Sequence, residues 1–237
     1  MKTARNTRFF EGFQDGIPIG LGYLSVSFTF GMMAVTAGMP VWAAIAISMT
    51  NLTSAGQFAG LSMITASAGY LEMALAQLII NLRYALMSIS LSQRLEKWVK
   101  TPDRMGISFG ITDEVFAVAS TKEYKVDGRY MGGLMLAPYF GWTLGTVLGA
   151  VAGELLPPSV QSALGIAIYG MFLAIVVPPA KKSLPVFVVL LLAVTLSCLF
   201  RFVPALTGVS EGFVIIICAG LAALCGAILF PEKEGEQ

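Results

Sequence analysis

The stretch TNLTSAGQFAGLS, residues 50–62, interrupts a chain that is otherwise rich in long apolar runs. Its first eight residues include five polar ones: Thr50, Asn51, Thr53, Ser54 and Gln57. On an ideal helix, which turns by about 100° per residue, these side chains point in almost every direction, whereas an amphipathic helix gathers them on one face. Gly56 and Gly60 also allow the backbone to open or to pack closely. The stretch therefore predicts a break in a helix near residues 50–57.

The composition around this stretch indicates an integral membrane protein. Of the 237 residues, 56% are hydrophobic and 12% are charged, whereas soluble domains carry roughly 25% charged residues. The apolar runs are long and continuous rather than alternating, which favours helices over a β-barrel. We expect an all-α polytopic protein in the lipid bilayer of the cytoplasmic (inner) membrane. A net charge of +1 leaves no footprint for nucleic acid.

The sequence offers little for an enzyme to use. It contains no histidine, and its three cysteines lack the CxxC spacing of a metal or redox site. No hydrolytic triad, phosphate-binding loop or haem ligand pair stands out. We therefore expect neither enzymatic activity nor a cofactor or metal. Without histidine, any proton relay has to use carboxylates.

Apolar windows divide the chain, as a single transmembrane permease domain over 1–237, into about seven membrane segments. Each reaches or approaches the length of about 20 residues that a bilayer requires. A shorter segment, 106–120, carries two acidic residues and is interpreted as a re-entrant or surface helix, or as a short crossing. The predicted spans lie near 17–38, 41–67, 71–92, 131–152, 160–180, 184–203 and 212–230.

The basic residues orient these spans, because cytoplasmic loops carry an excess of lysine and arginine. Three clusters mark the N-terminus and two later loops as cytoplasmic: Lys2, Arg5 and Arg8; Lys122, Lys125 and Arg129; and Lys181 and Lys182. The second half then alternates cleanly and places the C-terminus in the cytoplasm as well.

The first half does not alternate cleanly. Three crossings from a cytoplasmic N-terminus put four basic residues on the outside: Arg94, Lys97, Lys100 and Arg104. Either 41–67 forms two half-helices that turn back near 50–57, or 106–120 crosses and the rule is violated once. We favour the first, because the polar run already indicates a break. Irregular backbone at membrane depth is tolerated only inside protein or beside a cavity, so this reading predicts a cavity.

A weak internal repeat accompanies this pattern. FGMMAVTAGMP (30–40) resembles LGTVLGAVAGELLP (144–157), and an apolar run follows each. Internal duplication is typical of transporters. Chance similarity is the alternative, since small residues recur in many spanning helices. The charges do not decide between a parallel and an inverted repeat.

Polar residues form one stripe along 71–92 at steps of three and four: Gln77, Asn81, Tyr84, Ser88 and Ser92. This stripe faces other protein or water rather than lipid. It serves either a binding site or simple hydrogen bonding between helices.

The charged candidates are Arg83, Asp113 and Glu114. A charge deep within a span needs a partner, and the two acids are the obvious candidates for Arg83. The alternatives are a purely structural ion pair or an arginine that snorkels to the membrane surface. Thr112 or Asp113 is suited to cap a short helix. Capping explains one acid at most, and the other is free to hold an ammonium group or carry a proton.

Three motifs occur in order: SAGQFAG (54–60), INLRYALMSISL (80–91) and ITDEVFA (111–117). Together they resemble the AzlC family, the large permease subunits of branched-chain amino acid exporters. The resemblance runs from DGIPIG at 15–20 to about residue 180. Tyr84 stands where many relatives have histidine, which puts in doubt any mechanism based on a histidine there.

The resemblance implies export of leucine, isoleucine and valine, and by extension methionine. It also implies a small, separately encoded membrane partner of the AzlD type. Such exporters are secondary transporters driven by an ion gradient.

Our hypothesis places a zwitterionic amino acid at the break. Asn51, Ser54 and Gln57 bind it, and an opposing wall is formed by Gln77, Asn81 and Tyr84. Asp113 or Glu114 takes the ammonium group or couples a proton, and Arg83 holds the acid or assists with the carboxylate. The alternative is a passive channel-like or gating subunit for a small polar solute, which needs no coupled titratable group.

Overall fold

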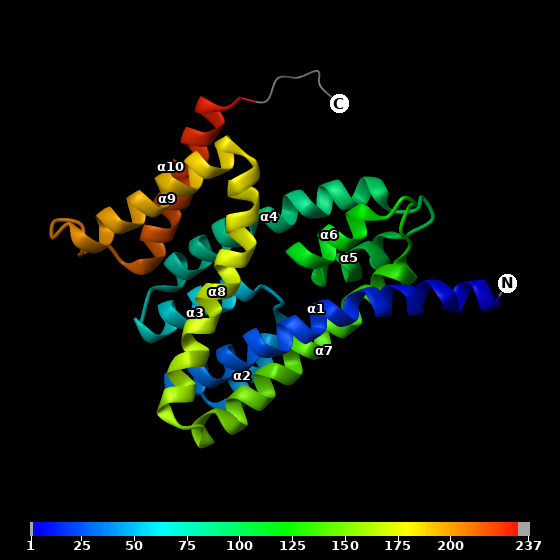
Figure 1. The fold of residues 1–237 in the computed structure, drawn as a ribbon, viewed down its shortest axis with the longest axis horizontal. Helices are drawn as coiled ribbons and strands as arrows, with labels where there is room; N and C mark the ends of the chain where they lie inside the picture. Colours follow the sequence, from blue (N-terminus) through cyan, green and yellow to red (C-terminus); the bar gives the residue numbers. More distant parts are fainter. Residues whose placement is uncertain (1, 232–237) are drawn as a thin grey trace. The chain divides into compact units, whose positions relative to one another are not determined.

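The computed structural model describes residues 2–231, without the side chains of residues 2–7 and of several positions between 154 and 175. Within this range the chain forms ten α-helices and one 3₁₀ turn, which confirms the all-α prediction (Figure 1). The helices are α1 (Lys2–Thr36), α2 (Val41–Thr50), α3 (Ser54–Thr65), α4 (Tyr70–Arg94), α5 (Thr101–Phe109), α6 (Asp113–Thr121), α7 (Gly128–Ala152), α8 (Pro158–Lys182), α9 (Leu184–Phe202) and α10 (Glu211–Leu229), with the 3₁₀ turn at Gly153–Leu155.

Five of the described helices are long and apolar enough to cross a membrane: Arg8–Thr36 of α1, α4, α7, α9 and α10. The predicted count of about seven segments is not confirmed. The window 41–67 is two short helices rather than one span. The window 160–180 lies in α8, where many side chains are outside the described set.

The chain divides into two compact units. Unit 1 comprises the residues up to Phe58 together with Asn81–Ile168, and unit 2 comprises Ala59–Ile80 and the residues from Tyr169 onward. The prediction of a single permease domain over 1–237 stays a prediction.

The centre of unit 1 is the pair α1 and α7, which lie side by side (Figure 1). A Cβ atom at Gly12 would overlap the carbonyl oxygen of Tyr130, and one at Gly31 would overlap that of Thr146. Glycine thus permits backbone approach that larger residues would block. Gly12 and Tyr130 lie early in α1 and α7, and Gly31 and Thr146 lie later in the same helices. The two helices therefore run parallel. The predicted repeat, which lies toward the ends of these helices, stays a prediction.

The turn after α1 shows why the chain starts a new helix. Gly38 has a φ of +88°, a left-handed conformation that glycine adopts without strain. The N–H of Met39 donates to the carbonyl of Ala34 at 2.9 Å, as expected for a helix that ends on glycine. Pro40 then precedes the first turn of α2.

A buried apolar cluster joins the second half of α4 to α5, α6 and α7. Its largest fully buried members include Leu91, Val115, Tyr130 and Leu134. The short helix predicted over 106–120 is replaced here by α5 and α6, with a break at residues 110–112. The break arises because Gly110 follows the last turn of α5 and Thr112 caps the first turn of α6.

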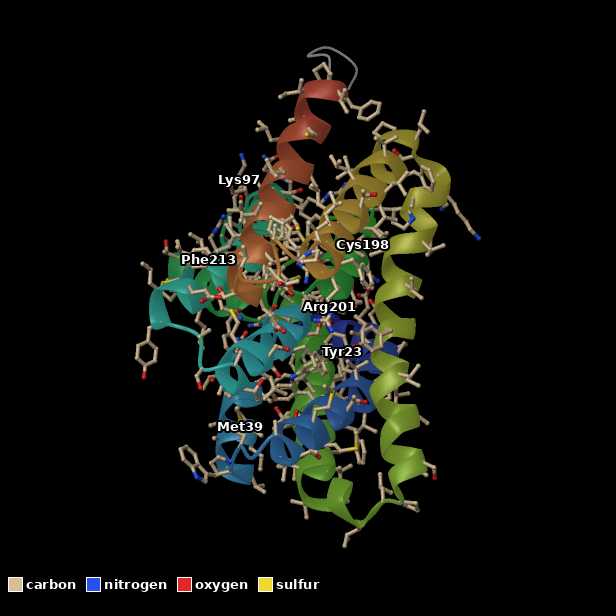
Figure 2. All side chains as sticks on the ribbon, turned by 90° about the vertical axis from the view of Figure 1, so that its left-hand side faces the viewer. Tyr23, Met39, Lys97, Cys198, Arg201 and Phe213 are labelled. Carbon is tan, nitrogen blue, oxygen red and sulfur yellow. The ribbon has the colours of Figure 1, made fainter. Side chains whose placement is uncertain are left out.

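Unit 2 contains the hairpin of α9 and α10. Gly226, near the end of α10, packs against Val189, near the start of α9, so the two helices run antiparallel. The carboxylate of Glu72 on α4 accepts hydrogen bonds from the Ser210 hydroxyl at 2.5 Å and from the Gly212 N–H at 2.9 Å. Glu72 therefore caps the positive end of α10. Figure 2 labels Cys198 and Arg201 on α9.

Candidate functional site

The break predicted near residues 50–57 is confirmed as three non-helical residues between α2 and α3. Asn51 is extended, with φ −147° and ψ 117°, and its side-chain oxygen accepts from the Thr53 N–H at 3.1 Å. The Thr53 hydroxyl in turn accepts from the Gly56 N–H at 3.2 Å. These local bonds satisfy backbone groups that the interrupted helix leaves open.

Gln57 ties this break to α7. Its amide oxygen accepts from the Ser48 hydroxyl and from the Trp142 indole N–H, each at 3.2 Å. Its amide nitrogen donates to the backbone carbonyl of Asn51. The Ser48 hydroxyl also lies 2.8 Å from that of Thr146 on α7. With only 3% of Gln57 exposed, its side chain is a buried and fully engaged junction.

The second break, at residues 110–112, has a similar construction. The Gly110 N–H donates to the carbonyl of Ile107 at 3.0 Å and ends α5. The Thr112 hydroxyl accepts from the Val115 N–H at 3.3 Å and begins α6. Of the two capping residues that the sequence suggested, Thr112 is the one used. Asp113 and Glu114 are therefore left for other contacts.

Arg83 connects the two breaks. Its guanidinium nitrogen NH1 lies 2.5 Å from Oδ2 of Asp113, so Asp113 is the partner among the two predicted acids. Its other terminal nitrogen donates to the Tyr84 hydroxyl at 3.1 Å, and that hydroxyl donates to Thr53 at 3.4 Å. The Nε atom of Arg83 is buried and has no hydrogen-bond partner among the described residues.

Glu114 has a different partner. Its carboxylate accepts a hydrogen bond from the hydroxyl of Tyr23 on α1, which is labelled in Figure 2. The ring of Tyr23 meets that of Trp142 edge to face at 5.3 Å. Through Trp142 and Gln57, Glu114 is linked to the first break. The ion pairs found among the described residues involve Asp113, Glu11 and Asp15, but not Glu114.

An open pocket of about 220 Å³, called the cavity below, lies beside both breaks. Leu52 of the first break, Phe109 at the end of α5 and Gly110 of the second break contribute to its wall, and α7 supplies the rest. The α7 residues are Gly132, Met135, Leu136 and Tyr139. Its lining is predominantly apolar, as suits an aliphatic side chain.

The structure brings most of the predicted site residues together in unit 1. The connected ones are Asn51, Gln57, Arg83, Tyr84, Asp113 and Glu114. Ser54 is the half-buried first residue of α3, and Asn81 lies on α4 with its amide oxygen buried. Gln77 belongs to unit 2, where a Cβ at Gly60 would lie 3.4 Å from its amide nitrogen.

Several members of the network were not singled out from the sequence. They are Tyr23, Ser48, Trp142 and Thr146, which lie within apolar helices. Thr53 belongs to the polar run at 50–57 but was not among the predicted site residues. Tertiary packing of α1 and α7 on the two breaks brings the other four into place, and no local pattern marks them.

These features define the class: a multi-pass helical membrane protein with two broken helices and a polar network between them. The chain matches the AzlC protein family over residues 18–156 and belongs to that family, which confirms the resemblance. The matched region contains both breaks and every member of the network.

The relatives found are membrane proteins from distant organisms. Inner membrane protein YgaZ of Escherichia coli is 31% identical, covering 92% of this chain and 91% of its own length. An uncharacterized membrane protein of Archaeoglobus fulgidus is 33% identical over 75% of this chain and 78% of its own. One from Helicobacter pylori is 27% identical over 62% and 66%. No solved structure matches the chain.

Proposed function

We propose that the protein is a secondary transporter subunit that exports branched-chain amino acids, and related apolar ones, across the cytoplasmic membrane. An ion gradient drives the export. The observation that carries this proposal is the apolar cavity of about 220 Å³ between two helix breaks, in the same unit as a network of charged and polar groups that begins at those breaks. A branched-chain amino acid has a zwitterionic end and an aliphatic end, so its binding site needs both polar groups and apolar surface.

The polar end of the substrate is matched by the two breaks. Helices α3 and α6 both begin there, and the positive end of a helix favours a carboxylate. Asn51, Ser54 and Gln57 lie in or next to the first of these helix starts. Of the two carboxylates at the start of α6, at positions 113 and 114, one supplies negative charge for the ammonium group or couples a proton.

The aliphatic end of the substrate is matched by the cavity wall. Leu52, Met135 and Leu136 form apolar surface, and burying apolar area is favourable by roughly 25 cal/mol per Å². Methionine is flexible and adapts to differently branched side chains. This supports one site for leucine, isoleucine and valine together, and methionine as an extension.

The remaining predicted residues have supporting roles in the proposal. Tyr84 holds Arg83 to the first break through its hydroxyl, and Asn81 continues the same helix face one turn earlier. Gln77, one turn before Asn81 on α4, remains a proposed substrate-binding residue. None of these roles requires a metal or cofactor.

The proposal includes a small membrane partner of the AzlD type. Family membership is the main support for it. In addition, α9 has no buried residue among those described, so its apolar surface is available to lipid or to another subunit. We propose cytoplasmic ends for the chain on the basis of its basic loops.

The test is efflux of labelled isoleucine from loaded proteoliposomes, with and without the co-purified partner and with and without a proton gradient. We expect efflux that needs the partner and responds to the gradient. A variant that fills the cavity, Met135→Trp, should abolish it. Phe140→Trp, an exposed aromatic on the same helix, is the matched control and should retain it.

Two results would contradict this proposal in different ways. Efflux that ignores every ion gradient would indicate the passive channel-like alternative. The absence of efflux for all branched-chain amino acids, with the partner present, would overturn the substrate class.

A further inference from the structure

The two adjacent acids at the start of α6 have different partners. Asp113 pairs with the cation Arg83, whereas Glu114 accepts from the neutral phenol of Tyr23. We propose that Glu114 is the carboxyl group that carries the coupling proton, and that Asp113 is the fixed counter-ion of Arg83. This inference rests on the proposed export function and deepens it.

Asp113 is poorly suited to carry a proton. Its oxygen lies 2.5 Å from the guanidinium, and arginine stays protonated in proteins. Protonating Asp113 would remove the charge that balances Arg83 across this contact. The geometry therefore assigns Asp113 to the ion pair with Arg83.

Glu114 does not have this constraint. Among the described residues no cation lies within ion-pair distance of its carboxylate. A phenol both donates and accepts hydrogen bonds. The Tyr23 hydroxyl can thus donate to the carboxylate and accept from the carboxylic acid, so the contact survives when the proton binds or leaves.

The charged and titratable groups around Glu114 favour this role. Helix α6 contributes Asp113, α4 contributes Arg83 and Tyr84, and α1 contributes Tyr23. From α7, the neutral Trp142 packs against Tyr23. One cation and two carboxylates leave a single excess negative charge. One bound proton neutralises it.

The proposed cycle accounts for the proton at each step. A proton from the outside binds the Glu114 carboxylate to give the carboxylic acid, and the same proton leaves to the cytoplasm in the opposite state of the transporter. The exported amino acid is a zwitterion without net charge. Each cycle therefore exports one amino acid and moves one proton and one positive charge inward.

The link to the first break gives this protonation a route to the substrate site. Tyr23 contacts Trp142, and Trp142 donates to Gln57 at the start of α3. A change at Glu114 is thus two side chains away from the break. Tyr23 is a positioning residue in this scheme.

The experiment compares Glu114→Gln with Asp113→Asn in proteoliposomes that also contain the small partner. Counterflow of labelled against unlabelled isoleucine, without any gradient, reports substrate exchange alone. Uphill efflux driven by a proton gradient, and alkalinisation or acidification followed by a trapped pH dye, report coupling. We expect Glu114→Gln to keep counterflow and to lose both coupled signals, and Asp113→Asn to lose counterflow as well.

Two further variants sharpen the test. Glu114→Asp keeps a carboxyl group and should restore coupled efflux. Tyr23→Phe removes the hydrogen bond that positions the carboxylate, so it should weaken proton-coupled efflux while counterflow is kept. A purely structural role of either residue would not produce these effects.

The possible failures are distinguishable. If the unmodified protein shows no counterflow, the proposed export function is wrong. If counterflow is normal but Glu114→Gln still couples protons to efflux, the assignment of Glu114 is wrong. Loss of counterflow in a Glu114→Gln variant that melts like the unmodified protein would also overturn it, because Glu114 would then be needed for substrate exchange itself.

Discussion

Arg83 on α4 and Asp113 on α6 form an ion pair in which NH1 and Oδ2 lie 2.5 Å apart. The pair joins α4 to α6, the helix that begins at the second break. Its side chains are partly exposed, at 40% and 30%. Asp113, rather than Glu114, is thus the counter-ion of Arg83, the one basic residue deep within a predicted span.

Breaking this pair should destabilise the protein. We expect Arg83→Gln to cost more than the roughly 0.2–1 kcal/mol of an exposed pair and less than the roughly 3–5 kcal/mol of a fully buried one. The double variant Arg83→Gln with Asp113→Asn should be more stable than either single variant, because it leaves no unpaired charge. Thermal unfolding of the detergent-purified proteins measures this. Equal additive losses would mean that the two residues do not interact.

Substitution of Gln57 should destabilise the protein because its side chain is a buried hydrogen-bond acceptor. Gln57→Ala leaves the Trp142 N–H without the acceptor that it has at 3.2 Å, and an unsatisfied buried group costs about 1–3 kcal/mol. The melting temperature should fall and isoleucine exchange should be lost. Gln93→Ala, at an exposed position near the end of α4, is the control and should change neither. A Gln57→Ala variant with normal stability would show that this junction contributes little.

Part of this site could be predicted from the sequence because its signals are local. The polar run at 50–57 cannot form one wet helix face, and Thr112 is a standard capping residue before an acidic turn. Arg83 needed an acid, and few acids are available within the apolar sequence. These three arguments use only neighbouring residues and general electrostatics, and the break, the cap and an acidic partner are all found.

Other parts depend on tertiary packing and had no such signal. Tyr23 and Trp142 meet only because α1 and α7 pack closely in parallel. The break within 106–120 depends on Gly110, which ends α5. From the sequence alone, a glycine that ends a helix looks the same as a glycine inside a spanning helix. The count of about seven membrane segments is not confirmed, although the window 41–67 does hold the two short helices that its polar run predicted.

The glycine contacts between α1 and α7 lead to a test of packing. A Cβ at Gly149 would overlap the carbonyl oxygen of Phe28, so Gly149→Ala must force the helices apart. Overpacking of this kind typically costs about 1–3 kcal/mol. Gly132→Ala on the same helix meets nothing within 4 Å and should be neutral or slightly stabilising, since alanine favours helices by about 1 kcal/mol. Equal melting temperatures for the two variants would contradict the close packing.

Two ionisable groups in the loop before α7, Lys122 and Tyr124, should make the protein less stable at alkaline pH. Burial lowers the pKa of Lys122, but hydrogen bonds to Asp15 and Glu11 outweigh it and raise the pKa overall. Burial and a hydrogen bond to Glu11 raise the pKa of Tyr124 to about 12. Both groups hold their protons more tightly in the folded state, so their contribution is complete below the unfolded values near pH 10 and is lost as the pH rises through the folded ones.

Melting curves across the alkaline range measure this effect. We expect Lys122→Met to be less stable than the unmodified protein near neutral pH and to show a shallower alkaline decline. Lys97→Met removes an exposed lysine, labelled in Figure 2, and should leave the curve unchanged. An identical alkaline decline in both variants would exclude the Lys122 cluster as its cause.

The break at residues 51–53 also predicts on which side of the membrane the basic loop after α4 lies. If α2 and α3 turn back and add no net crossing, α4 returns the chain to the cytoplasm and residue 100 lies inside. With the native cysteines replaced by alanine, Lys100→Cys should resist an impermeant thiol reagent added to intact cells and react after permeabilisation. Tyr70→Cys, at the 92% exposed start of α4, should react from outside, and Lys182→Cys should not. Labelling of Lys100→Cys from outside would mean that the positive-inside rule is violated at this loop and that α5 and α6 carry the missing crossing.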